Sequence, residues 1–540
     1  MLPFIDYPFI WISNSLGASK DELKLVFSVL LSYPLCGVLK RLPDAEPWKK
    51  SLFLIIVSVF YLVGLFDLWG GVRTLLISAA GTYAIAAYFK GPMMPWIGFA
   101  FLMGHMLTSH VYREFYPQPG VVDVTGAQMV LVMKLSAFCW NLYDGTLPIQ
   151  ELNDFQKDRR IEKLPNLLNY TAYVFFFPSL FAGPAFDYRE FERWLDCSMF
   201  NMEVPDVKRG GMKKKRKIPK SSVPATYKAV EGIVWILAFT WLSAKYPAEL
   251  YTGDEFTKYG MLRRYWLIYV FGFVARTKYY GIWSLTEGAC ILSGLGFNGV
   301  GPDGKACWDR CVNVKPKEME KAANSRAYLE NWNIKTNTWL RNYVYLRVTP
   351  KGKKPGFRSS MVTFGTSALW HGTSPGYYLS FLTASFVQTI AKNFRRHIRP
   401  LFLTATTPPL PGRYKPAYDV FGWVVTQITF SYIVAPFLLL NLADSICVWK
   451  RLGFLIHIGI AVSMAVFASP AKKWVNARQR KRVGRVEKEK EEREEQEAGP
   501  MGLPDDMEED MEEIRLELRG RRDSFLEEMR KRSERPVVKK

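Results

Sequence analysis

Long uncharged apolar stretches, separated by short polar and basic segments, dominate the chain up to about residue 470. A helix needs roughly 20 apolar residues to span the ~30 Å hydrocarbon core of a bilayer. Nine uninterrupted stretches predict transmembrane helices: 22–40, 51–68, 71–89, 93–111, 126–147, 228–246, 261–285, 420–440 and 452–469. Two further stretches, 169–186 and 359–391, are apolar but interrupted by Gly and Pro. Such interruptions are tolerated at membrane depth only beside protein or a cavity, so these two stretches predict bent or re-entrant segments.

This pattern predicts an all-α, polytopic membrane protein with about 9–11 transmembrane helices plus re-entrant or bent segments. Residues 1–470 form the multi-span membrane domain in this interpretation. Residues 471–540 form a charged cytosolic tail, helical or disordered, because they lack apolar stretches and mix 20 Lys and Arg with 19 Asp and Glu. The pattern excludes an ordinary soluble enzyme, a disordered protein and a disulfide-built secreted domain.

Basic residues are in excess, with 72 Lys and Arg against 50 Asp and Glu in 540 residues. The excess is spread between the apolar stretches, which is typical of cytoplasmic loops and not of a nucleic-acid surface. Basic loops at 40–50, 208–220, 286–358 and 392–415 are therefore predicted to be cytoplasmic, and the acidic loop 247–260 lumenal. Since 286–358 and 392–415 share a side, segment 359–391 should enter and leave the membrane on the same side.

Cysteine is sparse, at seven residues, and only Cys307 and Cys311 lie close together. No His stands near this pair, so a four-ligand zinc site is not supported and we expect no bound metal.

Among the five histidines, His371 has the most suggestive position. It lies within the apolar segment SALWHGTSPGYY (367–378), and ionisable side chains at membrane depth are candidates for function. A neutral His is cheaper to bury than a charge, so a structural role stays open. His105 and His110 lie near the end of one predicted span, where we expect their rings to reach the membrane interface.

Asparagines alternate with aromatic residues in ENWNIKTNTWLRNYVYLRV (330–348). An Asn amide offers a donor and an acceptor without net charge, which suits binding of an oxygen atom inside a low-dielectric cavity. Asn333 and Asn337 are the main candidates. An interfacial amphipathic helix with an aromatic face explains the same residues equally well. A membrane transporter with a polar pathway of His and Asn is a further interpretation of the two segments together.

Three segments, in this order, resemble the membrane-bound O-acyltransferase (MBOAT) superfamily: YYGIWSLTEGA (279–289), WNIKTNTWLRNYVY (332–345) and SALWHGTSPGYY (367–378). Weaker similarity lies in LSAFCWNLYDG (135–145) and FFFPSLFAGPAFDYREF (175–191). The resemblance is strongest to the broad-specificity lysophospholipid acyltransferases of fungi and covers roughly residues 1–470.

The resemblance implies that His371 and Asn333 are the catalytic residues, with Asn337 as a rival for the Asn role; Trp332 and Tyr343 also match the branch pattern. It implies acyl-CoA as co-substrate with no permanently bound cofactor, a lysophospholipid acceptor, and an endoplasmic reticulum membrane. Family members with other acceptors leave a diacylglycerol, a sterol or a protein as alternatives. Nothing in the sequence indicates an oligomeric state.

Overall fold

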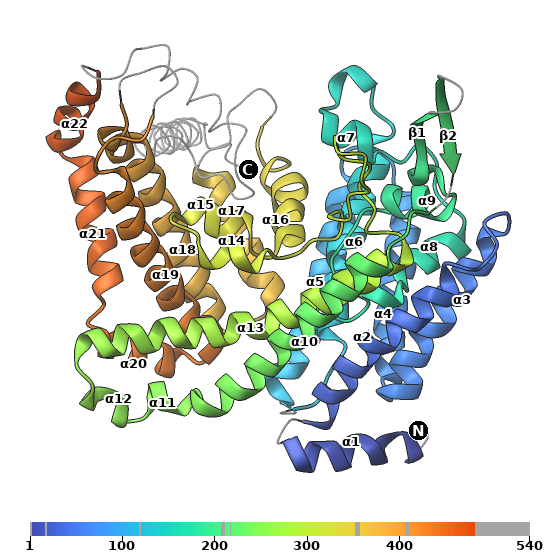
Figure 1. Ribbon diagram of the computed structural model, residues 1–540, viewed down its shortest axis with the longest axis horizontal. Helices are drawn as coiled ribbons and strands as arrows, with labels where there is room; N and C mark the ends of the chain where they lie inside the picture. The colour runs from blue at the N-terminus through green and yellow to red at the C-terminus, as the bar shows by residue number, and fades with distance from the viewer. Residues whose placement is uncertain are drawn as a thin grey trace, which may run out of the picture.

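The computed structural model describes residues 3–16, 19–117, 120–206, 211–216, 218–350, 357–404 and 410–480. Most of the predicted tail, residues 481–540, lies outside the described residues, so the prediction of a helical or disordered tail stays a prediction there. Figure 1 shows two groups of helices, with α2–α9 on one side and α18–α22 on the other, and the long helix α13 running between them.

All nine predicted apolar stretches form helices. They are α2 (Lys20–Leu39), α3 (Pro47–Val59) continued by η1 (Phe60–Leu65), α4 (Trp69–Tyr88), α5 (Met94–Phe115), α6 (Thr125–Asp144), α10 (Ser222–Lys245), α13 (Met261–Ser293), α19 (Lys415–Leu439) and α21 (Leu455–Ala468).

The remaining helices are shorter or flank these elements. They are α1 (Pro3–Leu16), η2 (Ile149–Glu151), α7 (Asp154–Arg159), α8 (Leu167–Val174), η3 (Phe177–Ser179), α9 (Tyr188–Leu195), η4 (Ser198–Phe200), α11 (Glu249–Thr252), α12 (Glu255–Lys258), α14 (Pro316–Glu320), α15 (Ser325–Glu330), α16 (Ile334–Leu340), η5 (Arg341–Tyr345), α17 (Phe357–His371), α18 (Pro375–Asn393), η6 (Phe394–Ile398), η7 (Arg399–Phe402), α20 (Leu442–Arg451) and α22 (Pro470–Arg480).

By length and composition, three of the described helices could each cross a membrane: α2, α3 with η1, and α19. The pair α20 and α21, bent by 75°, raises this to up to four. The count is below the predicted 9–11 because several other long helices carry buried polar groups. In α6, for example, Lys134, Asn141 and Asp144 are all buried inside the protein. A helix surrounded by protein does not need a uniformly apolar surface.

Both interrupted stretches are broken as predicted. In 169–186, α8 ends at Val174 and is followed by the single turn η3 and an irregular segment, because Pro178 and Pro184 each remove a backbone donor. In 359–391, α17 and α18 pack side by side and are joined by Gly372–Ser374. Gly372 has φ +144°, a conformation that only glycine adopts readily. This helical hairpin is the shape expected of a segment that returns to the side from which it enters.

The described fold is all-α as predicted, apart from one short hairpin. Strands β1 (Asn201–Asp206) and β2 (Gly211–Arg216) pair as an antiparallel hairpin. Strand β2 lies within the basic segment 208–220 that was predicted as a cytoplasmic loop, and β1 directly precedes that segment. Strands can form there because a hairpin needs only local pairing and does not require a hydrophobic face of its own when it projects from a larger domain.

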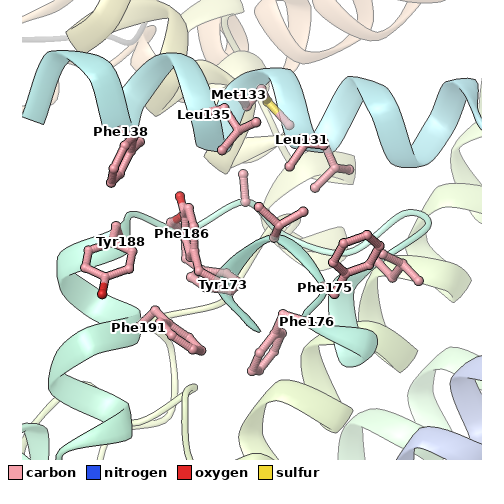
Figure 2. Close-up of a cluster of buried hydrophobic side chains, with 14 of the residues drawn as sticks. Leu131, Met133, Leu135, Phe138, Tyr173, Phe175, Phe176, Phe186, Tyr188 and Phe191 are labelled. Carbon is pink, nitrogen blue, oxygen red and sulfur yellow. The ribbon is translucent and has the colours of Figure 1, made fainter. Parts of the chain in front are cut away.

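Helix α6 is the centre of the core, with 17 of its 20 residues buried. In Figure 2, Phe138 of α6 points toward Tyr188, while Phe186 and Tyr173 lie below the helix. The Lys134 ammonium of α6 donates to the Tyr173 carbonyl oxygen and lies 4.4 Å from the ring centroids of Tyr173 and Phe186. Lys134 therefore fixes α8 against α6 by a hydrogen bond to a backbone carbonyl, and the irregular segment after α8 through its contact with the Phe186 ring.

Candidate functional site

His371 is the last residue of α17, directly before the turn into α18. Its Nδ1 lies 2.7 Å from the carbonyl oxygen of Ser367, one helical turn earlier. Because a carbonyl oxygen only accepts, Nδ1 carries the proton, and the neutral ring keeps a lone pair on Nε2. Four aromatic rings surround the imidazole at centroid distances of 4.6 to 5.8 Å: Trp370, Tyr377, Phe381 and Phe437.

Asn333 occupies the residue before α16 in a left-handed conformation, with φ +44° and ψ +51°. Asn is among the few residues that adopt this conformation at low cost. Its Oδ1 accepts hydrogen bonds from Thr336 Oγ1 at 2.8 Å and from Asn313 Nδ2 at 3.2 Å. Within the described residues, Nδ2 of Asn333 donates to no protein group, so its N–H groups are available to a substrate oxygen.

Asn313 holds the segment around Asn333 and was not identified from the sequence. It is 3% exposed. Besides its bond to Asn333, its Oδ1 accepts from the Lys335 backbone N–H at 3.0 Å and its carbonyl oxygen accepts from the Ile334 N–H at 2.9 Å. These bonds satisfy two of the free N–H groups at the start of α16 and fix the direction of the Asn333 side chain.

Asn337, the rival candidate, has a different environment. Its Nδ2 donates to the carbonyl oxygens of Leu329 and Trp332, both at 2.7 Å. Both amide hydrogens are therefore used to close the turn between α15 and α16. This geometry makes Asn337 a structural residue and leaves Asn333 as the Asn with a donor to offer.

The segments that carry His371 and Asn333 attach to successive turns of α6. Trp370, the neighbour of His371, donates from Nε1 to the Met129 carbonyl oxygen at 3.0 Å. Thr336, the partner of Asn333, donates from Oγ1 to Met133 Sδ at 3.3 Å. Residues 129 and 133 are about one turn apart on the same face of α6, about 6 Å along its axis. The two predicted site residues are thus brought to the same part of the core from segments 38 residues apart.

The aromatic residues of α16 and η5 face the inside of the protein. Trp339 donates from Nε1 to Ser136 Oγ of α6 at 2.8 Å, and its ring centroid lies 6.0 Å from that of Trp370. Trp339 and Tyr343 are both buried. This packing contradicts the alternative of an interfacial helix with an exposed aromatic face.

A polar network continues from η5 to the weaker sequence matches at 135–145 and 175–191. Tyr343 Oη lies 2.9 Å from Asn141 Oδ1 and 2.9 Å from Asp187 Oδ1. Arg347 binds the Asp144 carboxylate with two nitrogens, and its guanidinium carbon lies 4.3 Å from the Trp140 ring centroid. These contacts explain why the three segments occur together: each supplies part of one network along α6.

Glu190 extends this network to the loop after α13. Its carboxylate pairs with Arg159 Nη1 at 2.5 Å and with Arg310 Nη1 at 3.0 Å. Burial raises the pKa of Glu190, but the positive charges of Arg159, Lys335 and Arg310 outweigh it and lower the pKa to about 2. The carboxylate is therefore ionised throughout the physiological pH range.

The remaining matched segment, 279–289, lies on α13. Trp332 packs against Trp283 and Tyr279 of α13, with centroids 5.1 and 5.5 Å apart, so α13 supports the residue next to Asn333. Glu287 is buried on α13 and pairs with Lys228 of α10 at 3.4 Å, which makes it a link between those two helices.

His110 was also missed as part of this region. The expectation that its ring reaches a membrane interface is wrong, because the residue is 6% exposed and its Nε2 lies 3.2 Å from the carbonyl oxygen of Trp370. It therefore supports the turn after His371. No local sequence pattern links a histidine on α5 to a carbonyl group 260 residues later.

A family model described as MBOAT, membrane-bound O-acyltransferase family, matches residues 115–435. This range includes α6, Asn333 and His371.

Three relatives match most of the chain. It is 47% identical over 483 residues to a lysophospholipid acyltransferase of Schizosaccharomyces pombe, covering 89% of this chain and 93% of the relative. It is 40% identical to a lysophospholipid acyltransferase of Saccharomyces cerevisiae, covering 87% and 78%. It is 30% identical to membrane-bound glycerophospholipid O-acyltransferase 1 of Mus musculus, covering 83% and 89%.

Proposed function

The chain belongs to the membrane-bound O-acyltransferase family, and from this premise we propose that it transfers a fatty acyl group from acyl-CoA to the free sn-2 hydroxyl of a lysophospholipid. The observation that carries the proposal is a His with a free Nε2 lone pair and an Asn with a free Nδ2 donor, whose neighbours Trp370 and Thr336 are bonded to neighbouring turns of α6. The relatives named as lysophospholipid acyltransferases support the choice of acceptor.

His371 is the general base of the proposed reaction. Its Nε2 takes the proton of the acceptor hydroxyl while the oxygen attacks the thioester carbonyl carbon of acyl-CoA. The bond to the Ser367 carbonyl keeps the ring in the required tautomer as charge develops on it. When the C–S bond breaks, the imidazolium returns the proton to the coenzyme A thiolate. The products are a phospholipid and coenzyme A, and no acyl-enzyme intermediate is required.

Asn333 stabilises the tetrahedral intermediate of this reaction. Its Nδ2 donates to the oxyanion that forms from the thioester carbonyl, and its Oδ1 is held by Asn313 and Thr336. A donor that is already oriented needs no reorganisation during the reaction, which is the main source of stabilisation in oxyanion sites.

The membrane arrangement is part of the proposal. The long helices beyond the three to four with uniformly apolar sequence also cross the bilayer, giving about 9–11 spans in the endoplasmic reticulum membrane, with the tail from residue 471 in the cytosol. Coenzyme A is charged and arrives from the cytosol, where the basic region 286–358 attracts its phosphates. The lysophospholipid arrives from the membrane.

An acceptor panel tests the proposed activity. Purified full-length protein receives one acyl-CoA and, in parallel, several lysophospholipids, a diacylglycerol, a sterol and a peptide, and the products are identified by mass spectrometry. We expect acylated product from lysophospholipids alone, with His371→Ala protein as the inactive control. Product formed preferentially from diacylglycerol, sterol or peptide would overturn the choice of acceptor.

A further inference from the structure

A cavity of about 1030 Å³ lies between α15, α18, α19 and α21, in the helix group at one side of Figure 1. Neither His371 nor Asn333 lines it. Its volume is at the upper end of the range for sites that bind small molecules. The cavity is therefore a candidate binding site separate from the proposed reaction centre.

The α21 side of this cavity is apolar and continues to the outside of the protein. Leu455 and Val462 of α21 are 53% and 56% exposed, and Phe421 of α19 is 67% exposed. Exposed apolar side chains that continue into a cavity are suited to an apolar molecule lying along them. Because α19, and α20 with α21, are among the described helices that could cross a membrane, lipids of the bilayer can reach this side.

A buried amide on the α15 side of the cavity has an unused donor. Gln388 of α18 is 7% exposed, and its Oε1 accepts a hydrogen bond from Ser325 Oγ of α15 at 3.4 Å. Its Nε2 has no acceptor among the described residues. A buried N–H without an acceptor costs free energy, so it marks a position where a ligand oxygen is expected.

Two hydroxyl groups of α19 line the same cavity. Thr426 and Thr429 are 8% and 7% exposed, and neither hydroxyl forms a hydrogen bond within the described part of the chain. The next residue, Phe430, stacks on Tyr328 of α15 with ring centroids 4.0 Å apart, so this part of α19 lies beside α15. The cavity thus has an uncharged polar end at α15 and an apolar end at α21.

The charges of the lining are largely compensated. Both of its carboxylates and four of its five cations have partners: Glu330, Asp419, Arg326, Lys415, Lys392 and Arg395. The fifth cation, Arg399, lies in η7, beyond the end of α18. Burying a charged group without a counter-charge is costly, so the polar end at Gln388 favours a ligand whose own polar group is uncharged.

We propose that this cavity binds a sterol of the surrounding bilayer. The sterol hydroxyl accepts a hydrogen bond from Gln388 Nε2 and donates one to the hydroxyl oxygen of Thr426 or Thr429, while the ring body lies between α19 and α21. A hydroxyl is uncharged and both accepts and donates, which is what this polar end requires. The sterol has its polar group at one end of an apolar body, in the same order as the cavity from α15 to α21.

The sterol in this site is a ligand and not an acyl acceptor, because neither His371 nor Asn333 lines the cavity. It contacts α15, which ends three residues before Asn333, and α18, which begins four residues after His371. Occupancy therefore braces the two segments that lead to the reaction centre. This consequence rests on the proposed function, whereas the binding itself does not.

Photolabelling of the full-length protein tests the proposal. The protein in phosphatidylcholine nanodiscs receives cholesterol with a diazirine on its ring body, and labelled peptides are identified by mass spectrometry. We expect label on α19 and α21 that excess cholesterol removes. Label on these helices that excess cholesterol does not reduce would overturn the site.

A pair of variants tests whether this label comes from the cavity. Val462→Trp places a large ring in the cavity, whereas Val466→Trp places the same ring one turn further along α21, on an exposed valine that does not line it. The label should disappear in the first variant and remain in the second. Equal labelling, or equal loss, in the two variants would overturn the site.

Gln388→Leu provides a measurement that does not depend on a bulky ring. The variant keeps the approximate size of the side chain but loses the donor, so the apparent affinity for cholesterol should fall about three- to tenfold, the effect of one hydrogen bond. Thr383→Val is the control, since Thr383 is a buried residue of α18 that does not line the cavity. Unchanged affinity in Gln388→Leu, or an equal fall in the control, would contradict the assignment of the hydroxyl.

Competition separates the sterol from other lipids and from the substrates. Excess diacylglycerol, phosphatidylcholine, lysophosphatidylcholine or acyl-CoA should leave the cholesterol label in place. Stronger competition by diacylglycerol or phosphatidylcholine than by cholesterol would assign the cavity to that lipid, and displacement by either substrate would show a substrate path; each result would overturn the proposal. Labelling is measured without turnover, so failure here and failure of the proposed acyl transfer are independent results.

Discussion

The surroundings of α6 differ from the group formed by α18, α19 and α21 in how their polar side chains are bonded and in how closely their helices are packed. Along α6, the described polar groups reach across to other segments: Ser136 to Trp339, Asn141 to Tyr343 and Asp144 to Arg347. Between α18, α19 and α21, an open cavity is lined by apolar side chains and by the Gln388 amide, whose Nε2 has no acceptor among the described residues. The first region is therefore held by hydrogen bonds between segments, whereas the second leaves an open volume beside apolar side chains.

Loss of the proposed base should have the largest effect on the first region. We expect His371→Ala to reduce acyl transfer by at least ~10²–10⁴-fold, because general base catalysis contributes about that much. Transfer of labelled acyl groups to lysophospholipid in membranes containing equal amounts of protein measures this. His457→Ala, which removes a histidine on α21 that contacts Tyr432, should retain activity. Full turnover by His371→Ala would refute its role as base.

Substituting Asn333 and Asn337 in turn should distinguish a residue that takes part in the reaction from one that maintains the fold. For Asn333→Ala we expect turnover to fall ~10²–10³-fold, as for other oxyanion donors. For Asn337→Ala we expect lower thermal stability, by about 1 kcal/mol or more, because two partly buried carbonyl groups lose their donor. Both turnover and unfolding are measured for each variant. A stable but inactive Asn337→Ala beside an active Asn333→Ala would exchange the two roles.

Asn313 should act through Asn333. Asn313→Asp keeps an oxygen for the Lys335 N–H but loses the donor to Asn333 Oδ1. We expect kcat to fall about tenfold, the upper effect of one hydrogen bond, while KM for both substrates stays the same. A rise in KM with unchanged kcat would point to a role in substrate binding and contradict the positioning role.

Ser136→Ala should affect stability more than turnover. It leaves the buried Nε1 of Trp339 without an acceptor, at a cost of about 1–3 kcal/mol. Thermal unfolding in nanodiscs measures the loss, with the exposed Ser15→Ala as control. An unchanged unfolding temperature would show that the bond to Trp339 does not hold α16 on α6.

The smallest effect should come from removing residues 481–540. The groups assigned to the reaction all lie before residue 372, so turnover with the truncated protein should stay close to that of the full chain. Helix α22 is kept because its Asn476 bonds to His397 at 2.6 Å. Loss of activity on truncation would support a role of the tail in the function of the membrane domain.

Sequence reasoning predicted the elements of the fold better than their contacts. All nine apolar stretches are helices, and both interrupted stretches break where Gly and Pro occur, because apolar length and backbone chemistry are local properties. The hairpin of β1 and β2 was missed, since strand pairing in a basic loop carries no apolar pattern. The number of helices that cross the membrane stays a prediction.

For the candidate site too, the sequence indicated individual residues but not the contacts between distant segments. His371 stands out because it is polar within apolar sequence, and Asn333 was preferred through its motif. Asn313 and His110 could not be found in this way, because each acts through a bond to a distant segment. Position along the chain indicates which polar residues are unusual, but only the fold indicates which of them share a partner.

The left-handed backbone at Asn333 narrows the set of residues that evolution can place there. Most L-residues pay a steric penalty in this conformation, whereas glycine pays none. A glycine at this position would keep the chain path into α16 and remove the amide, together with its bonds to Thr336 and Asn313. On the role that we propose for Asn333, a chain with glycine at this position would retain the fold of the membrane domain and lose the donor for acyl transfer.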